Sequence, residues 1–559
     1  MRTLLAILFA TMTAAPAGYW PDSKANEILA KTESIRLAPD LSHLTAGERT
    51  AVKDLLEVGA IFQSIYEESR HHQALAAYKK LEARGDRKLL DIYRLFQGPI
   101  ATTLDNKREA IAPVDPQVPG RNVYPIDAKR EVLEGRADLL GERTVVRRAT
   151  KTNIDRDLAM IAKYPLLAAL HPNLAATLKN AKAFYAVPYS VAYADQLVRA
   201  SKLLMHAADA VESSDEEFAR YLRNRSRDLL SNDYESGDAS WVTGHFKHLN
   251  AQLGAYETYD DALFGVKAFH AVSVLVANDK ATEELRRALG GLQAIEDALP
   301  YESHKRIRED IPVGVYEVIA DFAQARGTNT ATILPNDPLF SRRYGRTILL
   351  RENIMRHPAI FAADLRVWRA ATTDAHANDL ADDGNFQRTL WHEIGHYLGV
   401  DRDRNGRTLD VALEDFADAT EEMKADLVSL FALQRMNHPS LRAIQASGIR
   451  RTLQNVKPRR DQPYQTMQLV QFNWFLEHGL IEADPRTARL TIHYDKYADV
   501  VTSLLREVLK LQHDGDKAAT AKFFDRWTVW GDPHENLAAR IREAQGARFR
   551  LVRYAALGE

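Results

Sequence analysis

The 559-residue chain contains no cysteine. This absence excludes disulfide bonds, thiol catalysis, cysteine-ligated zinc and a lipidated N-terminal cysteine. Any metal ion bound by side chains must therefore be held by histidine, aspartate or glutamate.

The chain also lacks a strong net charge. It has 74 lysine and arginine residues against 76 aspartate and glutamate residues, which gives a formal net charge of -2. Such a balance creates no strong field for nucleic acid or acidic lipid, so we expect no nucleic-acid partner. Any ligand must be recognised by a local site, and the composition leaves the oligomeric state open.

Long apolar runs are missing after the N-terminus, so we expect no membrane span. Residues 1–17 are typical of a secretory signal: Arg2 is positive, residues 3–13 are apolar but too short to cross a bilayer, and Ala15-Pro16-Ala17 resembles a cleavage site. The alternative is an N-terminal helix that docks on the core. A cysteine-free exported protein would suit a bacterial periplasm.

Helical patterns dominate the remaining chain. Apolar residues between Tyr193 and Val211 recur at steps of three and four, which predicts a helix, and Ser214 and Glu217 have the spacing of a capping box for the next one. The few strand-like segments are residues 144–147, 346–351 and 549–554. The sequence therefore predicts a mainly α fold with a small β component.

The segment from Asn385, a candidate N-cap, to Gly399, a candidate stop, predicts a helix that carries metal-binding chemistry. His392, Glu393 and His396 project from the side opposite its apolar stripe. Two imidazoles one turn apart can reach one zinc ion, and a glutamate directly after the first histidine can act as general base toward a water molecule. The alternative is a set of solvated polar residues on a helix.

A third ligand is expected from the next helical pattern, which begins with Glu421, Glu422 and Asp426. Glu422 and Asp426 are four residues apart and face one way, so one can bind the metal while the other accepts a hydrogen bond from a ligand histidine. The alternative is a solvated acidic first turn.

Between these two helices, Asp401–Gly406 (DRDRNG) resembles the opening of a calcium-binding loop. Ala412 stands where such a loop has its closing glutamate, and Arg402 and Arg404 offset the carboxylates. The pattern favours a plain turn over a calcium site.

Six segments carry a further signal. They are AYETYDDALFGVKAF (255–269), ILPND (333–337), HEIGH (392–396), EEMKAD (421–426), FNWFLEHGLIE (472–482) and IHYDKY (492–497). In this order they resemble the dipeptidyl-peptidase III family of zinc peptidases, in particular its shorter bacterial branch. The resemblance covers about residues 185–530.

The resemblance implies two lobes around a wide cleft, with the zinc site on the helical lobe. The implied segments are a signal peptide (1–17), a mixed substrate-gripping lobe (18–360, parts of which can belong to the other lobe), a helical zinc-binding catalytic lobe (361–530) and a C-terminal segment that returns to the mixed lobe (531–559).

The resemblance also implies one Zn²⁺ per chain. His392, His396 and Glu422 match the family's zinc ligands. Glu421 and Asp426 match residues that support the ligands.

Four further residues match positions that act on the substrate. Tyr259 matches the tyrosine that stabilises the developing oxyanion, and Glu257 and Asn336 match residues that hold the free N-terminus of a peptide. His493 matches a histidine that helps to bind or polarise the substrate carbonyl. Ile333 stands where the family has another asparagine.

Together these features predict a zinc metallopeptidase that releases dipeptides from the N-terminus of short peptides. Three alternatives are a zinc hydrolase of a non-peptide amide, a non-catalytic peptide-binding relative and a helical scaffold with an accidental motif. The intact Glu393 argues against the non-catalytic relative.

Overall fold

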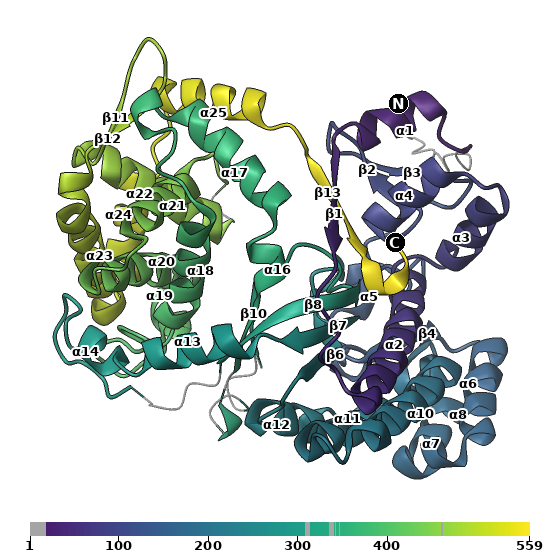
Figure 1. Ribbon diagram of the computed structural model, residues 1–559. Coiled ribbons are helices and arrows are strands. Elements are labelled where there is room, and N and C mark those ends of the chain that lie inside the picture. The colour runs from purple at the N-terminus through teal and green to yellow at the C-terminus, as the bar shows by residue number, and fades with distance from the viewer. Residues whose placement is uncertain (1–17, 308–312, 335–339, 341–342, 346, 460–461) are drawn as a thin grey trace, which may run out of the picture. The chain divides into compact units, whose positions relative to one another are not determined.

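The computed structural model describes residues 18–307, 313–334, 340, 343–345, 347–459 and 462–559. The predicted signal segment 1–17 and Asn336 lie outside the described residues. The chain divides into two compact units, one comprising Met1–Leu275, Ile319–Gly327 and Phe549–Glu559 and the other Val276–Val318 and Thr328–Arg548 (Figure 1). Helices are the main secondary structure of both units, which confirms the predicted mainly α fold with a small β component.

The first unit is built largely from helices. They are α1 (Asp22–Leu29), α2 (Ala46–Arg70), α3 (Ala74–Ala83), α4 (Arg87–Phe96), α5 (Arg130–Leu133), α6 (Lys151–Lys163), α7 (Pro165–Leu170), α8 (Leu174–Lys179), α9 (Tyr189–Ala192), α10 (Ala194–Val211), α11 (Glu216–Ser231) and α12 (Glu235–Thr243). The helix predicted from Tyr193 to Val211 is α10, and its apolar stripe is buried. The predicted capping box is wrong by one residue: Asp215, not Ser214, caps α11, because its carboxylate accepts a hydrogen bond from the Phe218 amide at 3.0 Å.

The strands of the first unit are short. They are β1 (Thr32–Leu37), β2 (Ile100–Thr102), β3 (Arg108–Ala110), β4 (Thr144–Arg148), β5 (Phe184–Pro188), β6 (Leu249–Glu257), most of β7 (Phe269–Ala277) and β13 (Phe549–Tyr554). β13 pairs in parallel with β1, so the C-terminus of the chain returns to a strand near its N-terminus (Figure 1).

A five-stranded sheet has the order β6-β7-β8-β10-β9, and the division between the two units falls inside β7 and inside β8 (Val313–Ala323). β10 (Thr347–Arg351) runs parallel to β8 and antiparallel to β9 (Ala331–Leu334). The described residues of all three segments predicted as strands lie in strands, which are β4, β10 and β13, and residue 346 lies outside the described residues.

The second unit is a helical body around one large apolar core. Its helices are α13 (Asp279–Leu289), α14 (Leu292–Glu296), α16 (Glu352–Met355), α17 (Pro358–Ala371), α18 (Asp382–Gly395), α19 (Leu409–Leu413), α20 (Ala417–Arg435), α21 (Leu441–Thr452), α22 (Pro463–Glu477), α23 (Tyr497–Asp514), α24 (Lys517–Trp527) and α25 (Asp532–Ala544), and a small hairpin is formed by β11 (Ile481–Ala483) and β12 (Leu490–Ile492). Figure 1 shows α18 and α20–α23 gathered together, and α20 packs against the other four.

The unit boundaries differ from the segments that the resemblance implies. The second unit contains all of residues 361–530 and also residues 276–318, 328–360 and 531–548. The return to the first unit begins at Phe549, because α25 packs on α17 of the second unit and only β13 pairs with β1.

The metal-motif helix begins earlier than predicted. α18 starts at Asp382, and Asn385 lies inside it, where its side chain donates to Asp364 Oδ2 at 3.2 Å. Two aspartates in the first turn favour this earlier start through the helix dipole. Gly384 also packs against the backbone of Ala443, a tertiary contact that the local pattern does not contain.

Across the described residues, no helix is both long enough and apolar enough to cross a bilayer.

Candidate metal centre

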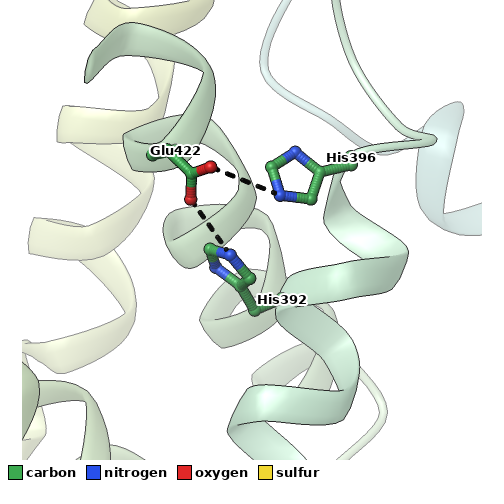
Figure 2. A group of neighbouring side chains, drawn as sticks. All are labelled: His392, His396 and Glu422. Carbon is green, nitrogen blue, oxygen red and sulfur yellow. Dashed lines mark ion pairs between the residues drawn. The ribbon is translucent and has the colours of Figure 1, made fainter. Parts of the chain in front are cut away.

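Three side chains from two helices converge in the second unit (Figure 2). His392 lies in the last turn of α18 and His396 at its C-terminal end, while Glu422 lies on α20. His392 Nε2 is 3.2 Å from Glu422 Oε2, and His396 Nε2 is 4.0 Å from Glu422 Oε1. One potential ligand atom from each residue lies within 4.8 Å of the other two. We call this group the His-His-Glu cluster.

A close contact between α18 and α20 brings the cluster together. A Cβ added to Gly395 would lie 2.6 Å from the backbone oxygen of Ala425 and 2.9 Å from its Cα. Because these are backbone atoms, any side chain at this position would push the helices apart. Gly395 lies between the two histidines of the motif, so its small size helps Glu422 to reach them.

Two further carboxylates orient the imidazole rings. His392 Nδ1 is 2.7 Å from Asp426 Oδ1, and His396 Nδ1 is 3.0 Å from Glu421 Oε1. An ionised carboxylate only accepts hydrogen bonds, so each Nδ1 is the donor. This arrangement turns both Nε2 atoms toward Glu422 and leaves their lone pairs available for a metal ion.

Cationic side chains hold these outer carboxylates in place. Asp426 Oδ2 lies 2.7 Å from Arg451 Nε, and Arg388 Nη1 is 3.5 Å from Asp426 Oδ1. Lys424 Nζ is 2.7 Å from Glu421 Oε1. Burial raises the pKa of both carboxyl groups, but Arg451 holds the pKa of Asp426 far below its usual range and Lys424 lowers that of Glu421 to about 2. Both groups are therefore ionised at neutral pH.

The donor set fits zinc. Zinc favours imidazole nitrogen and carboxylate oxygen, and bond lengths of about 2.0–2.1 Å at tetrahedral angles put ligand atoms about 3.3 Å apart. The separation of 3.2 Å between His392 Nε2 and Glu422 Oε2 is close to that value, and the separation of 4.0 Å between His396 Nε2 and Glu422 Oε1 is longer. Glu422 Oε2 is buried and accepts no hydrogen bond from the described residues, as expected of an atom that would bind a cation. Burial lowers the pKa of His392, but Asp426 and Glu422 raise it to about 9, so these carboxylates favour a positive charge at His392 Nε2, where a bound metal ion would replace the proton.

A pocket of about 670 Å³ opens beside the cluster within the second unit. Glu393, which is partly exposed, lines it next to His392, so a carboxylate that is not needed for the cluster faces the same space. Tyr464 of α22 also lines the pocket, and its hydroxyl lies near the Glu422 carboxylate. Desolvation and the Glu422 carboxylate raise the pKa of Tyr464 well above its ordinary value, which keeps this hydroxyl protonated.

The predicted residues Glu257 and Tyr259 lie in the first unit. Glu257 is the last residue of β6, and Tyr259 follows in the next turn rather than in the strand. The Tyr259 side chain is 81% exposed, and its hydroxyl lies near the Glu257 carboxylate. Partial desolvation and this carboxylate raise the pKa of Tyr259 to about 12, so its hydroxyl is a hydrogen-bond donor at neutral pH.

His493 lies in the second unit, directly after β12. Its Nε2 is 3.4 Å from Glu482 Oε2 on β11, and it is not among the described residues that line the pocket. The predicted role of His493 toward the substrate carbonyl stays a prediction. Asn336 is outside the described residues.

The segment Asp401–Gly406 is a turn held by arginine. The Asp403 carboxylate accepts hydrogen bonds from the Arg407 amide at 2.8 Å and from Arg407 Nε at 2.7 Å. It also accepts one from the Asn405 amide at 3.0 Å. These contacts occupy the carboxylate that a calcium ion would need, in agreement with the plain turn favoured by the sequence.

Several residues around the cluster were not predicted. Arg388 stands one turn before His392 on the same helix, so the helical period could have revealed it. Arg450, Arg451 and Tyr464 come from α21 and α22, and no local pattern connects those helices to the motif. Lys424 lies within the acidic segment, but only the folded structure shows that it contacts Glu421.

The fold and the site together define a class of protein: a mainly helical chain of two compact units, with an HExxH helix and a downstream glutamate that form a cluster able to hold a metal ion. Comparison with solved structures identifies proteins that share this fold. It matches dipeptidyl-peptidase III from Caldithrix abyssi with a TM-score of 0.80 and 23% identity, over 95% of this chain and 99% of that one. It also matches dipeptidyl-peptidase III from Corallococcus sp. strain EGB with a TM-score of 0.72 and 22% identity, over 96% of this chain and 97% of that one. The chain therefore has the fold of these proteins, which confirms the resemblance at the level of structure.

Sequence comparison gives another relative. The chain is 26% identical over 437 residues to Nudix hydrolase 3 of Arabidopsis thaliana, a match that covers 74% of this chain and 54% of that protein. The chain thus spans about half the length of this relative. No known family model matches the chain.

Proposed function

We propose that the protein is a zinc-dependent peptidase that releases dipeptides from the N-terminus of short peptides. The observation that carries this proposal is the convergence of His392, His396 and Glu422, with Glu393 beside them in a pocket. Two imidazoles, one carboxylate and a neighbouring free carboxylate are the parts that metal-assisted hydrolysis requires.

Zinc held by the His-His-Glu cluster would supply a Lewis acid that makes water a better nucleophile and a carbonyl a better electrophile. Glu393 would act as the general base that takes a proton from the attacking water and then passes it to the leaving amine. Asp426 and Glu421 would keep the two imidazoles in the tautomer that binds metal.

Residues of the first unit would act on the substrate. The Tyr259 hydroxyl, which is protonated and exposed, would donate a hydrogen bond to the oxyanion that develops during hydrolysis. Glu257 would hold the α-ammonium group of the substrate through a charge-assisted hydrogen bond. This contact would fix the distance between the free N-terminus and the bond that is cut, which limits the product to a dipeptide.

The proposal does not include the activity named in the Nudix relative, because the chain matches only about half of that protein. A zinc hydrolase of a non-peptide amide would use the same cluster, but it would show no preference for peptides with a free N-terminus. A non-catalytic relative would bind peptides without cutting them.

The test is to incubate the purified protein with a mixed library of short peptides, with and without a chelator, and to identify products by mass spectrometry. We expect dipeptides from the N-terminus, loss of cleavage with chelator and recovery with added zinc. Single residues or internal fragments would contradict the dipeptidyl specificity. Cleavage that the chelator does not affect would contradict the role of the metal.

A further inference from the structure

The pocket beside the His-His-Glu cluster extends along one face of α18. Its lining includes Asn385, Arg388, Thr389, His392 and Glu393, which recur at steps of three and four and therefore share that face. The pocket thus leads from the proposed reaction centre toward the N-terminal end of the helix.

Three arginines line the pocket: Arg388 from α18, and Arg450 and Arg451 from α21. Among the described residues, two carboxylates form ion pairs with these arginines. Arg451 and Arg388 share Asp426, at 2.7 and 3.5 Å, and Arg450 contacts Asp364 at 2.7 Å. Three guanidinium groups facing two carboxylates leave one positive charge in excess.

Glu393 is the remaining acid of the lining, and no ion pair joins it to these arginines within the described residues. It lies at the end of the pocket that contains His392, one helical turn beyond Arg388 and Thr389. Arg388 and Arg451 share Asp426, which contacts His392, whereas Arg450 lies with Asp364 and Asn385 toward the far end of the pocket.

Hydrogen-bonding capacity also remains at that end. Arg450 Nε is buried and has no hydrogen-bond partner among the described residues. Arg388 Nε donates a hydrogen bond to Ser447 Oγ at 3.1 Å, which holds the side chain in place. Burial and the nearby positive charge of Arg451 lower the pKa of Arg388 to about 10. A negatively charged ligand would relieve the repulsion between these cations and satisfy the open donor.

We propose that the arginine-lined end of this pocket binds a carboxylate of the peptide substrate on the leaving side of the scissile bond, with Arg450 as the main donor. This inference rests on the proposed peptidase function. A cationic pocket repels the α-ammonium group, which the acidic Glu257 would bind, so the pocket suits the opposite end of the peptide. The carboxylate belongs either to the C-terminus of a short peptide or to an acidic side chain after the cleaved bond.

The test compares three tetrapeptides with a free N-terminus: one with a free C-terminus, one with a C-terminal amide, and one amidated peptide with Glu in place of Gln at the third residue. The measured quantity is kcat/KM for release of the first two residues. We expect wild-type protein to prefer at least one carboxylate peptide over its neutral counterpart by about 10- to 100-fold, as for a charge-assisted hydrogen bond. Preference for the free C-terminus identifies the terminal carboxylate, and preference for Glu identifies the side chain.

Two variants test the residue assignment. Arg450→Gln should reduce the carboxylate preference to within about threefold, because the guanidinium charge is lost. Asp364→Asn should increase the preference, because Arg450 loses its protein partner. Arg526→Gln is the matched control, since Arg526 is 67% exposed and pairs with Glu477 away from the pocket lining. Equal cleavage of neutral and acidic peptides by wild-type protein, or an unchanged preference in Arg450→Gln, would overturn the inference.

Binding measurements separate this inference from the proposed function. Calorimetry with the Glu393→Gln protein and the same peptides reports carboxylate recognition without turnover. Tighter binding of the carboxylate peptides that disappears in the Glu393→Gln, Arg450→Gln double variant would support the pocket even if dipeptides are not the product. Equal binding of acidic and neutral peptides would reject it even if dipeptide release is observed.

Discussion

His392 Nδ1 lies 2.7 Å from Asp426 Oδ1, and this contact sets which nitrogen of His392 faces Glu422. Replacing Asp426 with Asn removes the charge that favours the metal-binding tautomer. We expect zinc affinity to fall about 10- to 100-fold, as is typical when the partner of a ligand histidine is changed. The measurement is a competition titration with a chromophoric chelator.

The same change leaves Arg451 and Arg388 without their carboxylate, so it also destabilises the fold. Asp403→Asn is the matched control, because it breaks an aspartate–arginine pair with Arg407 that does not contact the His-His-Glu cluster. Unchanged zinc affinity in Asp426→Asn, with normal affinity in the control, would show that Asp426 does not orient His392.

Glu393→Gln should keep bound zinc and lose turnover. The substitution removes the proton acceptor without touching the three ligands, so we expect kcat to fall by about 10²- to 10⁴-fold. Zinc content and peptide turnover are measured on the same sample, with Glu477→Gln, whose side chain is 56% exposed, as control. If zinc is lost together with activity, Glu393 would have a role in the metal site itself.

Gly395→Ala tests the contact between α18 and α20. The added methyl group would meet the backbone of Ala425, so we expect the free energy of unfolding to fall by about 1–3 kcal/mol and zinc affinity to fall as the helices separate. Gly291→Ala is the control, because a Cβ there meets no atom within 4 Å. The checks are thermal unfolding followed by circular dichroism and the chelator titration. A variant with wild-type stability and affinity would contradict the importance of this contact.

Acetylation of the peptide N-terminus should abolish cleavage, because it removes the positive charge that Glu257 would bind. For the same reason, Glu257→Gln should lower kcat/KM for free peptides by about 10- to 100-fold. Glu142→Gln, whose side chain is 63% exposed in the same unit, should have no effect. If acetylated and free peptides are cut equally well, the dipeptidyl assignment would be wrong while metal-dependent hydrolysis could still hold.

The metal motif was predictable because it depends on helical spacing alone. A distance of four residues puts His392 and His396 one turn apart, whatever else the chain does. Spacing on α20 left open whether Glu422 or Asp426 would be nearer to a metal. The structure separates them: Glu422 faces both Nε2 atoms, while Asp426 faces Nδ1 of His392.

Tertiary contacts determine the features that the sequence did not reveal. Asn385 has the character of an N-cap, but packing of Gly384 on Ala443 and the acidic first turn favour a start at Asp382. Arg450 and Arg451 reach the pocket because α21 packs against α18, which no local pattern encodes. His493 contacts Glu482, and its role toward the substrate carbonyl stays a prediction.

The central claim is tested most directly by the zinc content of the purified protein, measured by mass spectrometry of the element after dialysis. We expect about one zinc per chain in the wild-type protein, because two histidines and one glutamate with an open position suit zinc. Glu422→Ala should lose most of the metal, whereas Glu421→Ala should retain it with affinity reduced about 10- to 100-fold. No zinc in the wild-type protein even after reconstitution, or a greater loss in Glu421→Ala than in Glu422→Ala, would contradict the account.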